Sequence, residues 1–83
     1  MDKYSIIKKC IDELDYFNLL KSHAPVDEFD GESEEIAAKV TESLTVQEIA
    51  WIITEVFNKQ FNDTNSPDIF MDCAKKIYYE LHY

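Results

Sequence analysis

Apolar residues recur every three or four positions along four stretches of the chain, and this spacing is typical of amphipathic helices. In the first stretch it predicts a helix from about residue 3 to 14. The apolar stripe of this helix comprises Tyr4, Ile6, Ile7, Cys10, Ile11, Leu14 and Phe17. The letters YFNLL that follow predict a further turn or a short second helix. Pro25 ends any helical run before it, because the residue that precedes a proline is pushed out of the α region.

The second stretch, residues 32–43, predicts a short helix. Its inner face comprises Ile36, Ala37 and Val40. The acids Glu32, Glu34 and Glu35 fall in its first turn. Negative charge is favourable there, because the N-terminal end of a helix carries a partial positive charge.

The third stretch has the most clearly marked start. Thr45 and Glu48 form a capping-box pattern, and the apolar run begins at once. The predicted helix ends near Phe61, and its core stripe comprises Val46, Ile49, Ala50, Ile53, Val56 and Phe57. Trp51 and Ile52 broaden this apolar surface, so the pattern favours burial or partial burial for Trp51. The alternative is that Trp51 anchors a partner.

The last stretch begins after the turn-forming letters NDTNSPD. Ser66 is a favourable N-cap residue, and Pro67 falls at the first helical position, where its missing N–H group costs nothing. The apolar residues Phe70, Cys73, Ala74, Ile77 and Leu81 predict a helix that runs nearly to the C-terminus. The sequence therefore predicts an all-α fold, a small bundle of three long helices and one short helix around one core. Residues 1–83 are predicted to form a single helical domain.

The charge of the chain narrows the classes of partner it can bind. Its 17 acidic residues face 8 lysines and no arginine, for a formal net charge of -9. Nucleic acids and anionic membranes are disfavoured as partners because both are polyanions, whereas a basic protein is favoured. No window approaches the roughly 20 apolar residues of a membrane span, and the N-terminus lacks the apolar run of a signal peptide. We therefore expect a cytoplasmic protein, with Cys10 and Cys73 as buried free thiols.

The acidic stretch HAPVDEFDGESEE, residues 23–35, invites comparison with a calcium-binding loop. An EF-hand loop needs oxygen ligands at both end positions and a glycine at its sixth position. With Gly31 at the sixth position, the end positions fall on Val26 and Ala37, which cannot ligate. His23 and His82 have no partner at ligand spacing, and a single glycine rules out most phosphate-binding loops. We therefore expect no metal, no cofactor and no enzymatic activity.

A partner-binding surface is the prediction that remains. From Asp12 to Glu35 the chain has nine acids and one lysine, Lys21, and such a surface steers a basic protein into contact. Phe29 has two alternatives: it staples the loop to the core, or it anchors a partner. Tyr79 lies on the polar side of its helix and is predicted to be exposed, whereas Tyr78 is predicted to be buried at least in part. The predicted partner-binding residues are Asp12, Asp15, Asp27, Glu28, Phe29, Asp30, Glu32, Glu34, Glu35 and Tyr79.

Four segments, LDYFNLL, HAPVDEFD, ITEVFNKQF and CAKKIYYEL, resemble the YugE-like family of small bacterial proteins. The resemblance covers most of the chain from Leu14 onward, and it implies a helical-bundle fold without established catalytic residues. By size, charge and missing catalytic groups, the chain also resembles in type the immunity proteins of bacterial toxin systems, including contact-dependent growth inhibition. Such proteins bind and block a toxin domain, often a basic nuclease.

These observations predict a non-enzymatic acidic binding protein, most concretely an immunity protein that neutralises a cognate toxin domain. The alternative is a structural or regulatory helical domain that acts by self-association, which the surplus of aromatic residues for so small a core favours. The sequence leaves open the identity of the partner and the oligomeric state.

Overall fold

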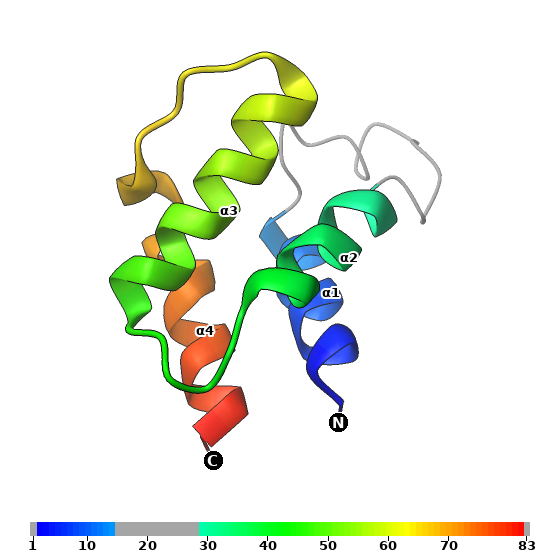
Figure 1. The fold of residues 1–83 in the computed structure, drawn as a ribbon, viewed down its shortest axis with the longest axis vertical. Helices are drawn as coiled ribbons and strands as arrows, with labels where there is room; N and C mark the ends of the chain where they lie inside the picture. Colours follow the sequence, from blue (N-terminus) through cyan, green and yellow to red (C-terminus); the bar gives the residue numbers. More distant parts are fainter. Residues whose placement is uncertain (1, 15–28, 83) are drawn as a thin grey trace.

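The computed structural model describes residues 2–14 and 29–82 (Figure 1). Within these ranges lie the helices α1 (Lys3–Leu14), α2 (Asp30–Lys39), α3 (Val46–Phe61), the short 3-10 helix η2 (Pro67–Phe70) and α4 (Met71–His82). The described residues contain no strand, which confirms the predicted all-α class. The predicted division into three long helices and one short helix is not matched: α2 has 10 residues, close to the 12 of α1 and of α4, and α3 has 16. The YFNLL segment lies outside the described residues.

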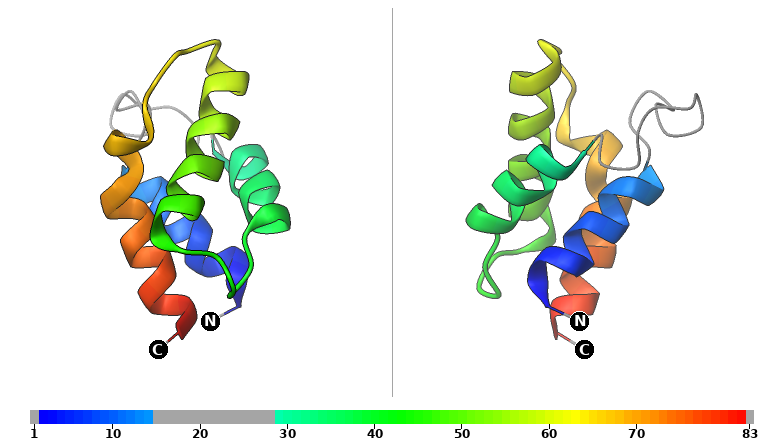
Figure 2. Two further views of the ribbon diagram at one scale, coloured as in Figure 1. Left: turned by 60° about the vertical axis from the view of Figure 1, so that its left-hand side comes forward. Right: turned by 90° about the vertical axis from the view of Figure 1, so that its right-hand side faces the viewer.

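The four α-helices pack in a ring that follows the order of the chain. The α1 helix contacts α2, α2 contacts α3, and α3 contacts α4, while α4 closes the ring against α1 (Figure 2). The first residues of α1 and the last residues of α4 lie at the same end of the bundle (Figure 1). Each helix therefore has two helical neighbours and one outward face, and each outward face is a candidate for binding.

The core lies inside this ring and is built from the predicted apolar stripes. Ile7 and Ile11 of α1, and Ile53 of α3, have no exposed surface. The aromatic part of the core surrounds Phe57, whose ring stacks on that of Phe70 at a centroid distance of 5.5 Å and meets Phe29 edge-on at 5.9 Å. Since Phe29 immediately precedes α2, Phe57 lies in α3 and Phe70 lies in η2, these contacts join three consecutive segments to one centre.

The sequence signals for helix ends are confirmed to different degrees. At the start of α3, the Thr45 Oγ1 atom accepts from the Glu48 N–H at 3.2 Å, and the Glu48 Oε1 atom accepts from the Thr45 N–H at 3.0 Å. This capping box and the end of α3 at Phe61 are as predicted. Ser66 does precede the last helical segment, but its side chain makes no capping hydrogen bond, and the segment starts as the 3-10 helix η2 before α4 begins.

The second helix also differs from its predicted range. It starts at Asp30 rather than Glu32, and it ends at Lys39, four residues before Ser43. The helix starts earlier because the backbone carbonyl of Phe29 already accepts a hydrogen bond from the Ser33 N–H at 2.9 Å. The side chain of Phe29 is buried, which keeps this backbone in place. Anchoring Phe29 in the core therefore fixes the first turn of α2.

Candidate partner-binding surface

The predicted partner-binding residues within the described ranges fall into three groups. Asp12 lies on α1, and Asp30, Glu32, Glu34 and Glu35 lie on α2, which packs beside α1. We name these five residues the acidic α1–α2 face, although they lie on more than one side of α2. Phe29 lies in the core. Tyr79 lies on α4, whose neighbours in the ring are α1 and α3. Asp15, Asp27 and Glu28 lie outside the described residues.

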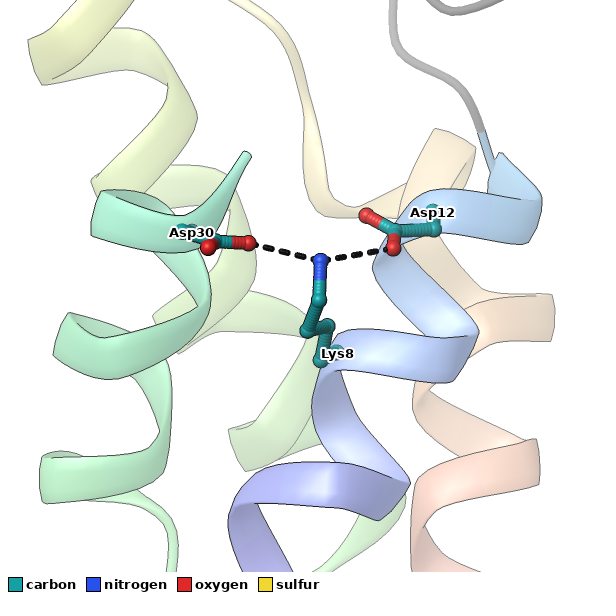
Figure 3. Close-up of polar contacts among 3 residues, drawn as sticks. All are labelled: Lys8, Asp12 and Asp30. Carbon is teal, nitrogen blue, oxygen red and sulfur yellow. Dashed lines mark hydrogen bonds and ion pairs between the residues drawn. The ribbon is translucent and has the colours of Figure 1, made fainter. Parts of the chain in front are cut away.

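Lys8 lies between Asp12 of α1 and Asp30 of α2 (Figure 3). Its Nζ atom lies 2.6 Å from Asp30 Oδ1 and 2.9 Å from Asp12 Oδ2, so one ammonium bridges the two helices. The hydrogen bonds to Asp30 and then to Asp12 raise the pKa of Lys8 well above its usual range. The single positive charge of Lys8 therefore offsets one of the two carboxylate charges, and the shared contact links α2 to α1.

The negative charge of Glu35, on the other side of α2, is also balanced by lysines. Its Oε1 atom lies 3.0 Å from Lys59 Nζ on α3 and 3.9 Å from Lys39 Nζ. The hydrogen bond from Lys59 holds the pKa of Glu35 below its usual value. Three of the five acids on the acidic α1–α2 face thus pair with lysines inside the protein, and within the described ranges no lysine lies within 4.0 Å of Glu32 or Glu34.

Phe29 takes the first of its two alternatives. Its side chain has no exposed surface, and its ring lies 5.9 Å from Phe57 and 6.4 Å from Phe61 between centroids. A partner approaching this conformation of the protein therefore cannot contact Phe29, which acts as the staple between the start of α2 and the core. Tyr79 is exposed to 56%, as its position on the polar side of α4 predicts, and Tyr78 is partly buried against the core.

Trp51 lies outside the core, although the apolar run of α3 favours its burial. Its side chain is 53% exposed. Leu44, Thr45, Gln47, Glu48, Trp51 and Ile52 line a shallow open groove at the N-terminal half of α3; we name these six residues the Trp51 groove. The groove is apolar at its floor, since Leu44 and Ile52 pack against the core from its edge.

A signal for this exposure is present in the sequence. Residues three or four positions apart share one side of a helix, and the neighbours of Trp51 at those positions are Gln47, Glu48, Thr54 and Glu55. Three of these four are exposed, and Thr54 turns inward to donate its hydroxyl to the Ala50 carbonyl at 2.7 Å. The polar surroundings of Trp51 therefore indicated the outward face of α3 better than the apolar character of Trp51 itself.

The two cysteines form a buried pair away from both surfaces. Cys10 on α1 and Cys73 on α4 are free and buried, as predicted. The thiol of Cys73 hydrogen bonds that of Cys10, and this contact together with burial raises the pKa of Cys73 far above its usual value. The Cys73 thiol is therefore protonated at neutral pH and acts as an apolar contact between α1 and α4.

The part of the chain that the structure describes holds neither a candidate metal site nor a helix that could span a membrane. Within it, no three His, Cys, Asp or Glu side chains gather at a point where they could hold a metal ion. None of the described helices is long and apolar enough to cross a membrane.

No family model, curated protein or solved structure matches the chain. The resemblance to the YugE-like family, and the likeness in type to immunity proteins, stay predictions.

Proposed function

We propose that this protein is a non-enzymatic acidic binding protein, most concretely a cytoplasmic immunity protein that binds and neutralises a cognate bacterial toxin domain. The observation that carries the proposal is that, among the described residues, carboxylates such as Glu32 and Glu34 have no lysine at ion-pair distance, on a chain of net charge -9. Lysines of the same chain already pair with Asp12, Asp30 and Glu35. The carboxylates that remain, Glu32 and Glu34 among them, attract a basic protein.

The physical consequence of such a surface is faster association. Uncompensated charge of one sign steers an oppositely charged partner over distances of about 10 Å at 0.1 M salt, and it raises the on-rate more than the final affinity. A toxin domain that acts on nucleic acid is basic for the same reason, because it must approach a polyanion. A nuclease domain of contact-dependent growth inhibition type is therefore the first partner to test.

The experiment pairs the protein with the toxin domain encoded beside its gene. We expect a complex at low salt and loss of toxicity on co-expression. The variant E32K/E34K should bind more slowly than the wild type, and added salt should narrow the difference between the two on-rates. Absence of a complex at low salt, together with undiminished toxicity, would overturn the proposal.

A second candidate function, self-association as a structural or regulatory domain, is favoured by one observation. Trp51, Ile69 and Tyr79 are large apolar side chains that are more than half exposed. Apolar surface of this kind is often covered in an oligomer. Sedimentation separates the two candidates: a dimer at micromolar concentration supports self-association, and a monomer counts against it.

A further inference from the structure

The Trp51 groove combines an exposed aromatic ring with an apolar floor. Ile69 and Tyr79 are equally exposed, but they do not line this groove, which is formed by the segment before α3 and its first two turns. Exposed tryptophan is the side chain most enriched among residues that dominate binding energy, because its large ring buries much area at little cost in conformational entropy. Among the described aromatic residues, Trp51 is therefore the best placed anchor for a partner.

The charged residues that neighbour the groove along the sequence are all acidic. Between Lys39 and Lys59 the chain carries Glu42, Glu48 and Glu55 and no lysine. Glu48 and Glu55 lie three positions before and four positions after Trp51, so they flank its ring on the same side of α3. In the described part of the chain, neither carboxylate has a lysine within 4.0 Å.

Lys59 is the nearest lysine along α3, but it does not pair with Glu55. It lies four positions after Glu55, where an ion pair along α3 would be favourable. Its Nζ atom is instead bound to Glu35 on α2, at 3.0 Å. Glu48 does accept the capping hydrogen bond from Thr45, but an N–H donor leaves the charge of the carboxylate in place.

We infer that the Trp51 groove is the docking site for a basic segment of a partner protein, which packs an apolar side chain against Trp51 and places lysine or arginine beside Glu48 and Glu55. The inference rests on the proposed function, in which the partner is a basic protein, and it adds the place and the chemistry of the contact. Charge complementarity selects this occupant. A second copy of the chain would bring the same glutamates face to face, and a nucleic acid or an anionic membrane would be repelled.

The probe is a synthetic peptide of about twelve residues that alternates pairs of lysine and leucine, a pattern that presents one apolar and one basic side when helical. Trp51 is the chain's only tryptophan, so its emission reports directly on the groove. At low salt we expect the peptide to shift this emission to the blue. A control peptide with serine in place of leucine should bind more weakly and leave the emission wavelength unchanged.

Two matched double variants locate the site. E48Q/E55Q removes two acids from beside Trp51, and E32Q/E34Q removes two acids from the acidic α1–α2 face, so both change the net charge equally. Glutamine at position 48 keeps the capping box, because it can accept the same hydrogen bond. By anisotropy of labelled peptide, E48Q/E55Q should weaken binding about five-fold or more and E32Q/E34Q less than about two-fold. Trp51→Ala should weaken it about ten-fold or more.

Three results would overturn the inference: no change in Trp51 emission at low salt, equal weakening by the two double variants, or the larger weakening from E32Q/E34Q. The toxin domain then separates this inference from the proposed function. If E48Q/E55Q binds the toxin domain as tightly as wild type does, the docking site is wrong and the proposed function stands. If neither the wild type nor any variant binds the toxin domain, while binding of the peptide still depends on Glu48 and Glu55, the proposed function is wrong and the docking site stands.

Discussion

The acidic α1–α2 face and the Trp51 groove are both rich in carboxylates, and they differ in what lies beside those carboxylates. On the acidic α1–α2 face, Lys8 bridges Asp12 and Asp30, and Lys59 reaches across from α3 to Glu35. Along the Trp51 groove, Glu48 and Glu55 have no lysine at ion-pair distance within the described residues. The first surface thus uses much of its charge to hold helices together, and the second keeps its charge for solvent or for a partner.

The aromatic residues of the two regions show the same division. Phe29 immediately precedes the acidic α2 helix and is fully buried, whereas Trp51 lies between two acids and is half exposed. A dense run of acids along the chain therefore does not by itself locate a binding surface. The charge that the fold leaves unpaired, next to an exposed apolar side chain, is the better guide.

The largest expected effect comes from truncating the two aromatic residues in turn. Phe29→Ala removes a buried ring from the centre of the core and should lower the free energy of unfolding by about 3–5 kcal/mol. Trp51→Ala removes a half-exposed ring that lies outside the core and should cost less than about 1 kcal/mol. Urea denaturation measures both values. Equal losses would mean that the two rings do not differ in role as described.

The next effect concerns the ammonium between α1 and α2. Lys8→Met leaves Asp12 and Asp30 facing each other without a cation and should lower the free energy of unfolding by about 1 kcal/mol. Lys75→Met is the matched control, because it removes the same charge from an exposed position on α4 that has no ion pair among the described residues. Its expected change is below about 0.5 kcal/mol. A loss as large for the control would show that only net charge matters.

Replacing one acid in each region should give effects of opposite sign. Glu35→Gln loses the contact with Lys59 and should destabilise the protein by about 0.5 kcal/mol at pH 7. Glu55→Gln removes an unpaired acid from a strongly negative chain and should be neutral or slightly stabilising. Thermal denaturation of the two variants against wild type gives both signs, and destabilisation by Glu55→Gln would contradict the account.

The Glu35 effect also carries a pH dependence of known sign. The pKa of Glu35 is lowered in the folded protein by Lys59, so its stabilising contribution is present above the unfolded pKa, roughly 4.3. The contribution is lost as the pH falls through the lower folded pKa. The stability difference between wild type and Glu35→Gln should therefore close in acid, and a difference that persists at pH 2 would have another cause.

The features of this structure that were predicted correctly are those set by residues close together in the sequence. The capping box at Thr45 and Glu48, the range of α1 and the end of α3 depend on neighbours in the sequence, and they are confirmed. The lysine bridges are not local: Lys8 and Asp30 are brought together only by the packing of α1 against α2. The early start of α2 likewise depends on the burial of Phe29 in a core supplied by other helices.

The groove beside Trp51 was not predicted, although the sequence left Trp51 open as either a core residue or a partner anchor. Apolar content alone assigns Trp51 to the core, but the side of α3 on which it lies is set by the angular positions of its neighbours. Ile49, Ala50 and Ile53 already fill the inner side of the first half of the helix, so the ring has no room among them. A count of polar residues three and four positions away from Trp51 would have placed it outside.

The most direct test of the account measures the electrostatic surroundings of Trp51 without any partner. Caesium and iodide ions both quench tryptophan emission, and each quenching constant is divided by that of free N-acetyltryptophanamide. The account predicts that caesium quenches Trp51 about two-fold better than iodide at low salt, because unpaired carboxylates concentrate cations within about a Debye length. It also predicts that E48Q/E55Q abolishes most of this preference and that E32Q/E34Q, with the same net charge, retains it. Equal quenching by the two ions in the wild type, or an equal loss of preference in both double variants, would contradict the claim that Glu48 and Glu55 set the local potential at Trp51.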